Sequence, residues 1–178
     1  AGIVTADGAR RIWLALGGNL GDRLANLRFG LDELVSGGVA IDAVSSVYDT
    51  PPWPNASDPR FANIAVSGHC ALSARELLRL CKRIEAAAGR DFDAPRNSPR
   101  PLDIDIVAID GEQLDEPDLK VPHALMQDRA FVLMPLAEVA EGFVHPGLGQ
   151  TAAELLDAVE TDGVTVFEAR GWWQGMAG

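Results

Sequence analysis

Residues 96–110 read RNSPRPLDIDIVAID, in which apolar and acidic side chains alternate from position 102 onward. Side chains of a β-strand point alternately to the two faces of a sheet, so Asp103 and Asp105 share one face and their apolar neighbours share the other. The two carboxylates then stand roughly 6.5–7 Å apart along the strand. Because like charges repel at this spacing, the pattern predicts a cationic partner between them.

A hard divalent cation is one such partner, since Mg2+ binds carboxylate oxygens together with water and substrate phosphates. Upstream, Arg90, Arg96 and Arg100 lie in a proline-rich segment that is typical of a loop. Arginine loops can close over phosphates, so the whole stretch favours two metal ions bridging a polyphosphate. The alternative is a solvated loop beside a polar strand face, with the aspartates paired to Arg96 or Arg100.

Charge and composition narrow the class of ligand. The chain has 178 residues, 47% of them apolar and 23% charged, which fits one globular domain over residues 1–178. Its net charge of −11 disfavours binding to nucleic acid or to an anionic membrane. Residues 82–100 nevertheless hold five cationic against three acidic residues. We therefore expect an anionic small molecule as the guest.

Several features predict a cytoplasmic protein, and we separately expect it to be a monomer. Cys70 and Cys81 have neither metal-ligand nor redox-motif spacing, which favours buried, reduced thiols. The first residues lack the basic and apolar regions of a signal peptide. No apolar run approaches the ~20 residues that a membrane-spanning helix needs.

Periodicity predicts the order of the elements. Strands are expected over residues 12–16, 39–49, 61–70 and through the two aspartates; helices are expected between residue 24 and Gly37 and between Ser73 and Gly89. Further along we expect an extended piece at 119–121, helices at 130–139 and 151–159, and a strand at 164–167. This order predicts an α+β fold with a ferredoxin-like βαββαβ core, namely a mostly antiparallel sheet with helices packed on it in α/β/α layers and a C-terminal extension.

Three further groups are candidates with simpler alternatives. The stretch GGNLGD at 17–22 follows a strand but lacks the Gly-Lys-Ser/Thr ending of a P-loop, so its glycines are interpreted as turn formers. His123 is a candidate together with Arg129, although a lone histidine is more often structural. An aromatic slot with one polar residue to recognise a ligand could be built from Tyr48, Trp53, Phe61, Asn63 and Phe131. The alternative is that these residues only pack in the core.

Taken together, the chain resembles the 6-hydroxymethyl-7,8-dihydropterin pyrophosphokinase family. The matching stretches occur in the family's order and cover most of residues 12–140: LALGGNLGDR, SSVYDTPPWP, FANIAVSG, the run from Glu85 to Ile106 ending in SPRPLDIDI, and VPHALMQDRAFVLMPLAEVA. The resemblance implies transfer of diphosphate from ATP to a pterin alcohol in folate biosynthesis. The chain departs from the family pattern at three places: at Phe92, where an arginine is usual, at Asn97-Ser98, where Trp-Gly is common, and at Ala124, where the residue is often larger.

The resemblance also implies site residues. Asp103 and Asp105 would hold two Mg2+ ions across the ATP phosphates, and Arg90 and Arg100 would belong to a mobile catalytic loop. The residues implied for ATP are Glu85, Arg96, Arg100, Ile106, His123 and Arg129. Those implied for the pterin are Thr50, Pro51 and Trp53 through the backbone, Asn63 through its amide, and Phe61 and Phe131 as stacking rings.

The implied reaction is in-line attack of the pterin hydroxymethyl oxygen on the β-phosphorus of ATP, with AMP as the leaving group. Asp105 is a candidate acceptor of the hydroxyl proton. Two rival functions stay open at this point: a non-catalytic ligand-binding module, which ferredoxin-like folds also support, and a Mg2+-dependent nucleotide hydrolase.

Overall fold

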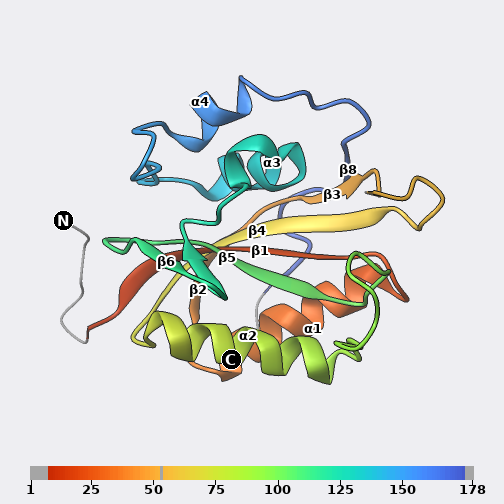
Figure 1. The fold of residues 1–178 in the computed structure, drawn as a ribbon, viewed down its shortest axis with the longest axis horizontal. Coiled ribbons are helices and arrows are strands. Elements are labelled where there is room, and N and C mark those ends of the chain that lie inside the picture. The colour runs from red at the N-terminus through yellow and green to blue at the C-terminus, as the bar shows by residue number, and fades with distance from the viewer. Residues whose placement is uncertain (1–7, 53, 175–178) are drawn as a thin grey trace.

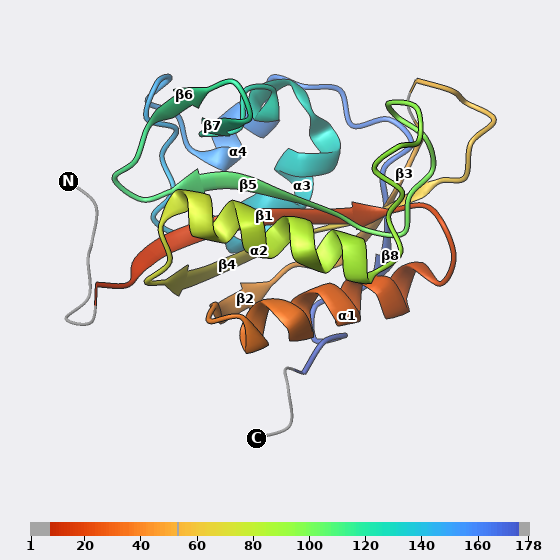
Figure 2. The same ribbon diagram turned by 60° about the horizontal axis from the view of Figure 1, so that its bottom comes forward.

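The computed structural model describes residues 8–52 and 54–174. One antiparallel sheet has the strand order β5-β1-β4-β3-β8, and β2 also pairs with β4. Helices α1 and α2 cover one face of this sheet and α3 and α4 the other (Figures 1 and 2). The predicted α+β fold, with its ferredoxin-like core and α/β/α layers, is confirmed. Within the described ranges, no helix is both long enough and apolar enough to cross a bilayer.

The elements follow the predicted order closely. They are β1 (Arg10–Gly18), α1 (Arg23–Ser36), β2 (Ala40–Val44), β3 (Val47–Thr50), β4 (Phe61–Cys70), α2 (Ala74–Ala87), β5 (Asp103–Ile109), β6 (Leu114–Glu116), β7 (Leu119–Val121), the 3-10 turn η1 (Met126–Asp128), α3 (Ala130–Val139), α4 (Ala152–Leu156) and β8 (Thr165–Glu168). The sequence analysis predicts neither β6, which pairs with β7, nor η1.

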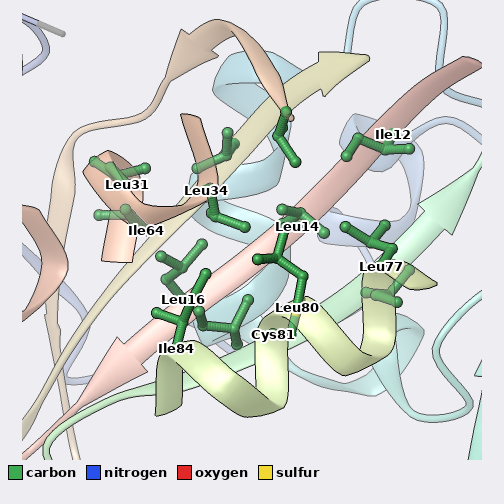
Figure 3. Packing of buried hydrophobic residues seen from close by; sticks show 14 of the residues in the cluster. Ile12, Leu14, Leu16, Leu31, Leu34, Ile64, Leu77, Leu80, Cys81 and Ile84 are labelled. Atoms are coloured by element: carbon green, nitrogen blue, oxygen red, sulfur yellow. The ribbon is translucent and has the colours of Figure 1, made fainter. Parts of the chain in front are cut away.

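The core lies mainly between the sheet and helices α1 and α2 (Figure 3). From β1, Leu14 and Leu16 point into it and are at most 1% exposed. Leu31 of α1 and Leu77 of α2 meet them from below the sheet. Each such side chain contributes about 1.5–3 kcal/mol by leaving water, so this layer fixes which face of every central strand is apolar. The opposite face packs against α3 and α4 through a second buried cluster that includes Trp13, Val107 and Leu136, and it is open only near the end of β1.

Capping sets the ends of the helices. Both halves of the predicted capping box of α2 form, because the Ser73 hydroxyl accepts from Glu76 N and the Glu76 carboxylate accepts from Ser73 N. The box at Thr151 and Glu154 forms as well. The predicted end of this helix near Val159 is wrong, since after Leu156 the hydrogen bonds tighten to i→i+3 turns.

The predicted strand over residues 39–49 is also wrong in its continuity, because Ser45 and Ser46 divide it into β2 and β3. The Ser45 hydroxyl accepts from Ala65 N at 2.9 Å and donates to Ser46 O at 2.8 Å, so a side chain replaces the backbone in the ladder. Ser46 N and Oγ donate to the Glu138 carboxylate from α3 at 3.3 and 3.0 Å. Strand β4 can therefore pair with both halves.

The glycine stretch 17–22 plays a role other than the predicted one. Only Gly21, with φ +78°, is a turn former, whereas Gly17 and Gly18 lie within β1. A Cβ at Gly18 would lie 2.1 Å from Pro101 O, and Asn19 N and Leu20 N donate to Arg100 O at 3.0 and 3.2 Å. The loop over residues 90–100, here called the arginine loop, therefore contacts the end of β1 through its backbone. Only glycine at position 18 permits this contact.

Gly18→Ala should destabilise the fold by about 2–3 kcal/mol, because a backbone atom must move to make room for the methyl group. Gly38→Ala is the matched control: its φ is +107° but nothing lies within 4 Å of its Cβ, so about 1 kcal/mol is expected. Urea unfolding measures both changes. Equal losses in the two variants would contradict the close approach at Gly18.

Candidate active site

A cavity of about 450 Å3 opens on the α3 side of the sheet, where β1 ends. The loops that follow β3 and α2 lie at this same end (Figures 1 and 2). The lining residues are Ala15, Leu16, Gly17, Thr50, Pro51, Phe61, Asn63, Asn97, Arg100, Asp103, Asp105, Leu125, Asp128, Arg129, Ala130, Phe131 and Val132. Nine of the site residues proposed from the sequence line this cavity, and a tenth, Arg90, contacts the lining residue Asp103.

Sheet register places the two ends of the cavity. In the ladders, Gly17 lies opposite Asp103 on β5 and opposite Asn63 on β4. A Cβ at Gly17 would stand 2.2 Å from Asn63 Oδ1, so the glycine makes room for the amide oxygen at the floor of the cavity. Two strand spacings separate Asp103 from Asn63, which is about 9–10 Å, enough for a flat ring and part of a phosphate chain.

Asp103 is held by two arginines. Arg90 Nη1 lies 2.6 Å from Asp103 Oδ1, and Arg100 Nη2 lies 3.5 Å from Oδ2. Burial acts to raise the pKa of Asp103, but the charges of Arg100 and Arg90 outweigh it and hold that pKa below its ordinary value. Asp103 is therefore ionised, and its charge is already compensated within the protein.

Asp105 lies on the same face without such compensation. It forms no ion pair with any of the described residues, and burial, followed by repulsion from Asp103 and Glu85, raises its pKa to about 7. The two aspartates thus differ in protonation: the surroundings of Asp103 favour the anion, and those of Asp105 favour the neutral acid. A bound cation would favour ionisation of Asp105 for the same electrostatic reason.

Arg100 reaches across the cavity. Its backbone is fixed, since Arg100 N donates to Asn19 Oδ1 at 2.9 Å in addition to the bonds that its carbonyl accepts. The guanidinium carbon lies 5.1 Å from the centre of the Phe61 ring, a cation–π contact. Its Nε is buried without a hydrogen-bond partner in the described part of the chain. A donor left unpaired in this way is suited to an anionic guest.

The far end of the cavity combines rings with polar groups. Asn63 Nδ2 donates to Thr50 Oγ1 at 2.7 Å, which fixes the amide and leaves its oxygen at the floor. Phe61 and Phe131 line the cavity from β4 and α3. Pro51 completes the wall beside Thr50, whereas Trp53 lies outside the described residues. This end can bind a flat heterocycle with polar edges.

Four residues proposed for ATP do not line the cavity. Ile106 points into the core beneath the sheet, and Arg96 is exposed on the loop. His123 is half-buried, with a pKa lowered by burial and by Arg129, and its Nδ1 accepts from Leu125 N. Glu85 is fully buried and accepts from Ile104 N at 2.8 Å and Lys82 Nζ at 3.2 Å.

Tyr48, also considered for the aromatic slot, is directed elsewhere. Its hydroxyl donates to Glu138 Oε2 at 2.5 Å and joins β3 to α3. Burial and this acidic partner raise its pKa far above the ordinary value. The tyrosine is therefore a buried structural group between β3 and α3, as the packing alternative holds.

Sequence reasoning misses Asn97 and Asp128 as lining residues. Asn97 has φ +66°, and it is the one non-glycine residue in the described ranges with positive φ. Asparagine tolerates this conformation, so an Asn between prolines was the available signal. Asp128 lies in η1, which no periodicity reveals.

Comparison with known proteins agrees with this geometry. Residues 13–141 match the family model for 7,8-dihydro-6-hydroxymethylpterin-pyrophosphokinase. The chain belongs to this family. It is 39% identical over 159 residues to the 2-amino-4-hydroxy-6-hydroxymethyldihydropteridine pyrophosphokinase of Methylorubrum extorquens, covering 89% of this chain and 99% of that one.

Some relatives are much longer. A folate synthesis bifunctional protein of Arabidopsis thaliana is 39% identical over 126 residues, which is 71% of this chain but 23% of that protein. Among solved structures, a Plasmodium falciparum HPPK-DHPS matches with a TM-score of 0.64 at 14% identity, over 84% of this chain and 45% of that one. At this identity the structural match supports the fold alone.

The unequal aspartates predict opposite effects of pH. The pKa of Asp105 is raised in the folded state, so below about pH 4 both folded and unfolded chains are protonated there and no penalty exists. The penalty grows from about pH 4 to about pH 7 and is complete above it. Asp105→Asn should therefore stabilise the metal-free protein by about 2–4 kcal/mol more at pH 8 than at pH 4.

Asp103→Asn supplies the contrast. Its lowered pKa contributes stability that is present above about pH 4 and is lost as the pH falls through the folded value. This variant should be destabilised at pH 8, and the loss should shrink in acid. Urea unfolding in EDTA over this pH range measures both variants. The same sign of change in both would contradict the asymmetry.

Proposed function

We propose that this protein transfers diphosphate from ATP to the hydroxymethyl oxygen of 6-hydroxymethyl-7,8-dihydropterin, with release of AMP. The observation that carries the proposal is the division of one cavity into two chemical ends. Asp103 and Asp105 lie on β5 at one end, Asn63 lies two strands away beside the phenylalanine rings, and the guanidinium of Arg100 reaches from Asp103 to Phe61. Membership of the pyrophosphokinase family agrees with this arrangement.

We propose that the pterin occupies the Asn63 end. Its ring would stack between Phe61 and Phe131, while the free oxygen of the Asn63 amide and the backbone near Thr50 and Pro51 would meet its polar edge. We propose the same contact for the backbone of Trp53. Stacking holds the ring plane, and hydrogen bonds fix its rotation, so the hydroxymethyl group is directed along the floor toward the aspartates.

Asp103 and Asp105 fit Mg2+ as a cofactor, and we propose two ions bound with ATP. Within the described residues no group of three or more His, Cys, Asp and Glu side chains could hold a metal. A pair of carboxylates without further protein ligands suits Mg2+, which completes its coordination with water and phosphate oxygens. When bound, the metal would neutralise charge on the phosphates.

The reaction itself needs alignment and charge stabilisation. The bound pterin oxygen would attack the β-phosphorus in line, and Arg100 and Arg90 would stabilise negative charge on the transferred group and on the departing oxygen. Asp105 is our candidate for accepting the hydroxyl proton at a carboxylate oxygen, because it lines the cavity and has no arginine bound to it. We propose a monomer, formed by a single domain, as the working unit.

The arginine loop supports a closing movement of limited extent. Arg90 N donates to Glu85 O at 3.1 Å and Arg100 is bound to Asn19, so both ends of the loop are anchored. We propose that residues 91–99 close over the nucleotide and bring Arg96 to the phosphates. Glu85 would act on ATP through Arg90 and β5, and Ile106 through its backbone. His123 and Arg129 would lie on the nucleotide side.

Incubation with ATP, Mg2+ and the reduced pterin tests the function directly. Release of AMP that requires the pterin identifies the pyrophosphokinase. Release of AMP without the pterin identifies a nucleotide hydrolase, and pterin binding without AMP release identifies a binding module. EDTA should abolish the release if the proposed metal requirement holds.

Asp103→Ala and Asp105→Ala should each lower turnover by at least about 100-fold, since charge compensation at the phosphates is lost. Circular dichroism should show an intact fold. Steady-state AMP release measures the effect, with Asp115→Ala, on exposed β6, as the control. Near-normal rates in both cavity variants would refute the metal role.

Arg96→Ala should raise the KM for ATP about tenfold while leaving the ligand-free fold unchanged, because the exposed side chain gains its contact only on closure. Arg83→Ala, which is also exposed but lies on α2, should leave the KM for ATP unchanged. An ATP affinity that is the same in Arg96→Ala and wild type would remove Arg96 from the nucleotide site.

A further inference from the structure

The C-terminal segment runs beyond the family match, which ends at residue 141, and crosses from one layer of the molecule to the other. Helix α4 lies above the sheet, β8 adds to the edge beside β3, and the chain then descends to the side of α1 (Figures 1 and 2). All four residues of β8 are exposed, so this strand contributes little to the core. Its contacts instead concentrate on β3.

A polar clasp joins this segment to the end of β3. Asp49, paired in the ladder with Thr165, accepts from Arg60 Nε and lies 3.5 Å from Arg23 Nη1. Arg60 also donates to Gly163 O at 2.6 Å, and the Arg23 guanidinium lies 4.9 Å from the Phe167 ring centre. Two arginines from different elements therefore bind β3 and the C-terminal segment together.

A second anchor lies at the start of β3. Trp172 Nε1 donates to Ser45 O at 2.9 Å, at the break between β2 and β3. Trp173 Nε1 donates to Asp32 of α1 at 3.2 Å. Both indoles are partly buried against the core. The C-terminal segment thus contacts β3 near both ends of that strand. Only the end of β3 near Asp49 approaches the cavity.

The contact with the cavity wall is direct. Gly163, with φ +79°, lies so close to Pro51 that a Cβ on it would be 3.0 Å from Pro51 Cγ. Pro51 lines the cavity, and the preceding Thr50 accepts the hydrogen bond that orients Asn63. We propose that residues 163–168 are a positioning element that sets the pterin end of the cavity from behind. This inference rests on the proposed function.

The proposal separates this element from a general stabilising extension. Strand β5, which carries Asp103 and Asp105 at the nucleotide end of the cavity, lies on the far side of β1 and β4 from β8. Moving Pro51 should therefore weaken the binding of the pterin and spare ATP. A purely structural element would lower the folded fraction and weaken both ligands equally.

Gly163→Ala tests the contact, with Gly171→Ala as its matched control. Both glycines have positive φ, at +79° and +96°, so both variants suffer the same backbone strain, but nothing lies within 4 Å of a Cβ at Gly171. Calorimetry with reduced pterin and a nonhydrolysable ATP analogue should show the pterin Kd raised at least about fivefold in Gly163→Ala. The analogue's Kd should stay within about twofold, and Gly171→Ala should resemble the wild type.

Arg60→Gln loosens the clasp without adding bulk and should weaken the pterin in the same selective way. Hydrogen exchange of the peptide covering residues 47–52 reports the mechanical link without any ligand, and it should be faster in Arg60→Gln and Gly163→Ala than in Gly171→Ala. Wild-type pterin affinity in both variants, or equal loss for pterin and nucleotide, overturns the inference. A wild type that binds ATP but no pterin overturns the proposed function, and this inference with it.

Discussion

The contact between Gly18 and the carbonyl of Pro101 governs how the cavity is built. Because no side chain stands at Gly18, the backbone at Pro101 lies against the end of β1, and two amide groups bind the carbonyl of Arg100. This contact aligns β5 beside β1, so that Asp103 comes opposite Gly17. The arginine loop, the carboxylates and the open floor therefore depend on one close approach between two backbones.

The register of the sheet then places charged and uncharged polar groups at different ends of the cavity. Along the row from Asp103 through Gly17 to Asn63, charge lies at one end and a fixed amide at the other, with a residue that has no side chain between them. Rigid strands hold these groups, while the loops that follow β3 and α2 provide the walls. Strands position side chains more accurately than loops, which suits a reaction that depends on alignment.

Short-range sequence patterns are sufficient to predict much of the fold and the position of the two aspartates. Alternation along β5 places both aspartates on the cavity face, because burying the apolar face against α2 leaves no other choice. The break at Ser45 escaped prediction, since it requires Glu138 and Trp172, which are distant in sequence. The burial of Glu85 escaped for the same reason: a carboxylate on an amphipathic helix gives no sign that a strand amide will bind it.

The charge balance at β5 has a consequence for the ligand-free protein. Asp105 and Glu85 both have raised pKa values, and each lies near the ionised Asp103, so these carboxyl groups repel one another and the two arginines only partly offset that repulsion. A fold selected for stability alone would place apolar or amide side chains there. The protein thus gives up some stability for function. Carboxyl groups that can receive a polyanion with its counterions are kept in an otherwise well-packed sheet, where they repel one another.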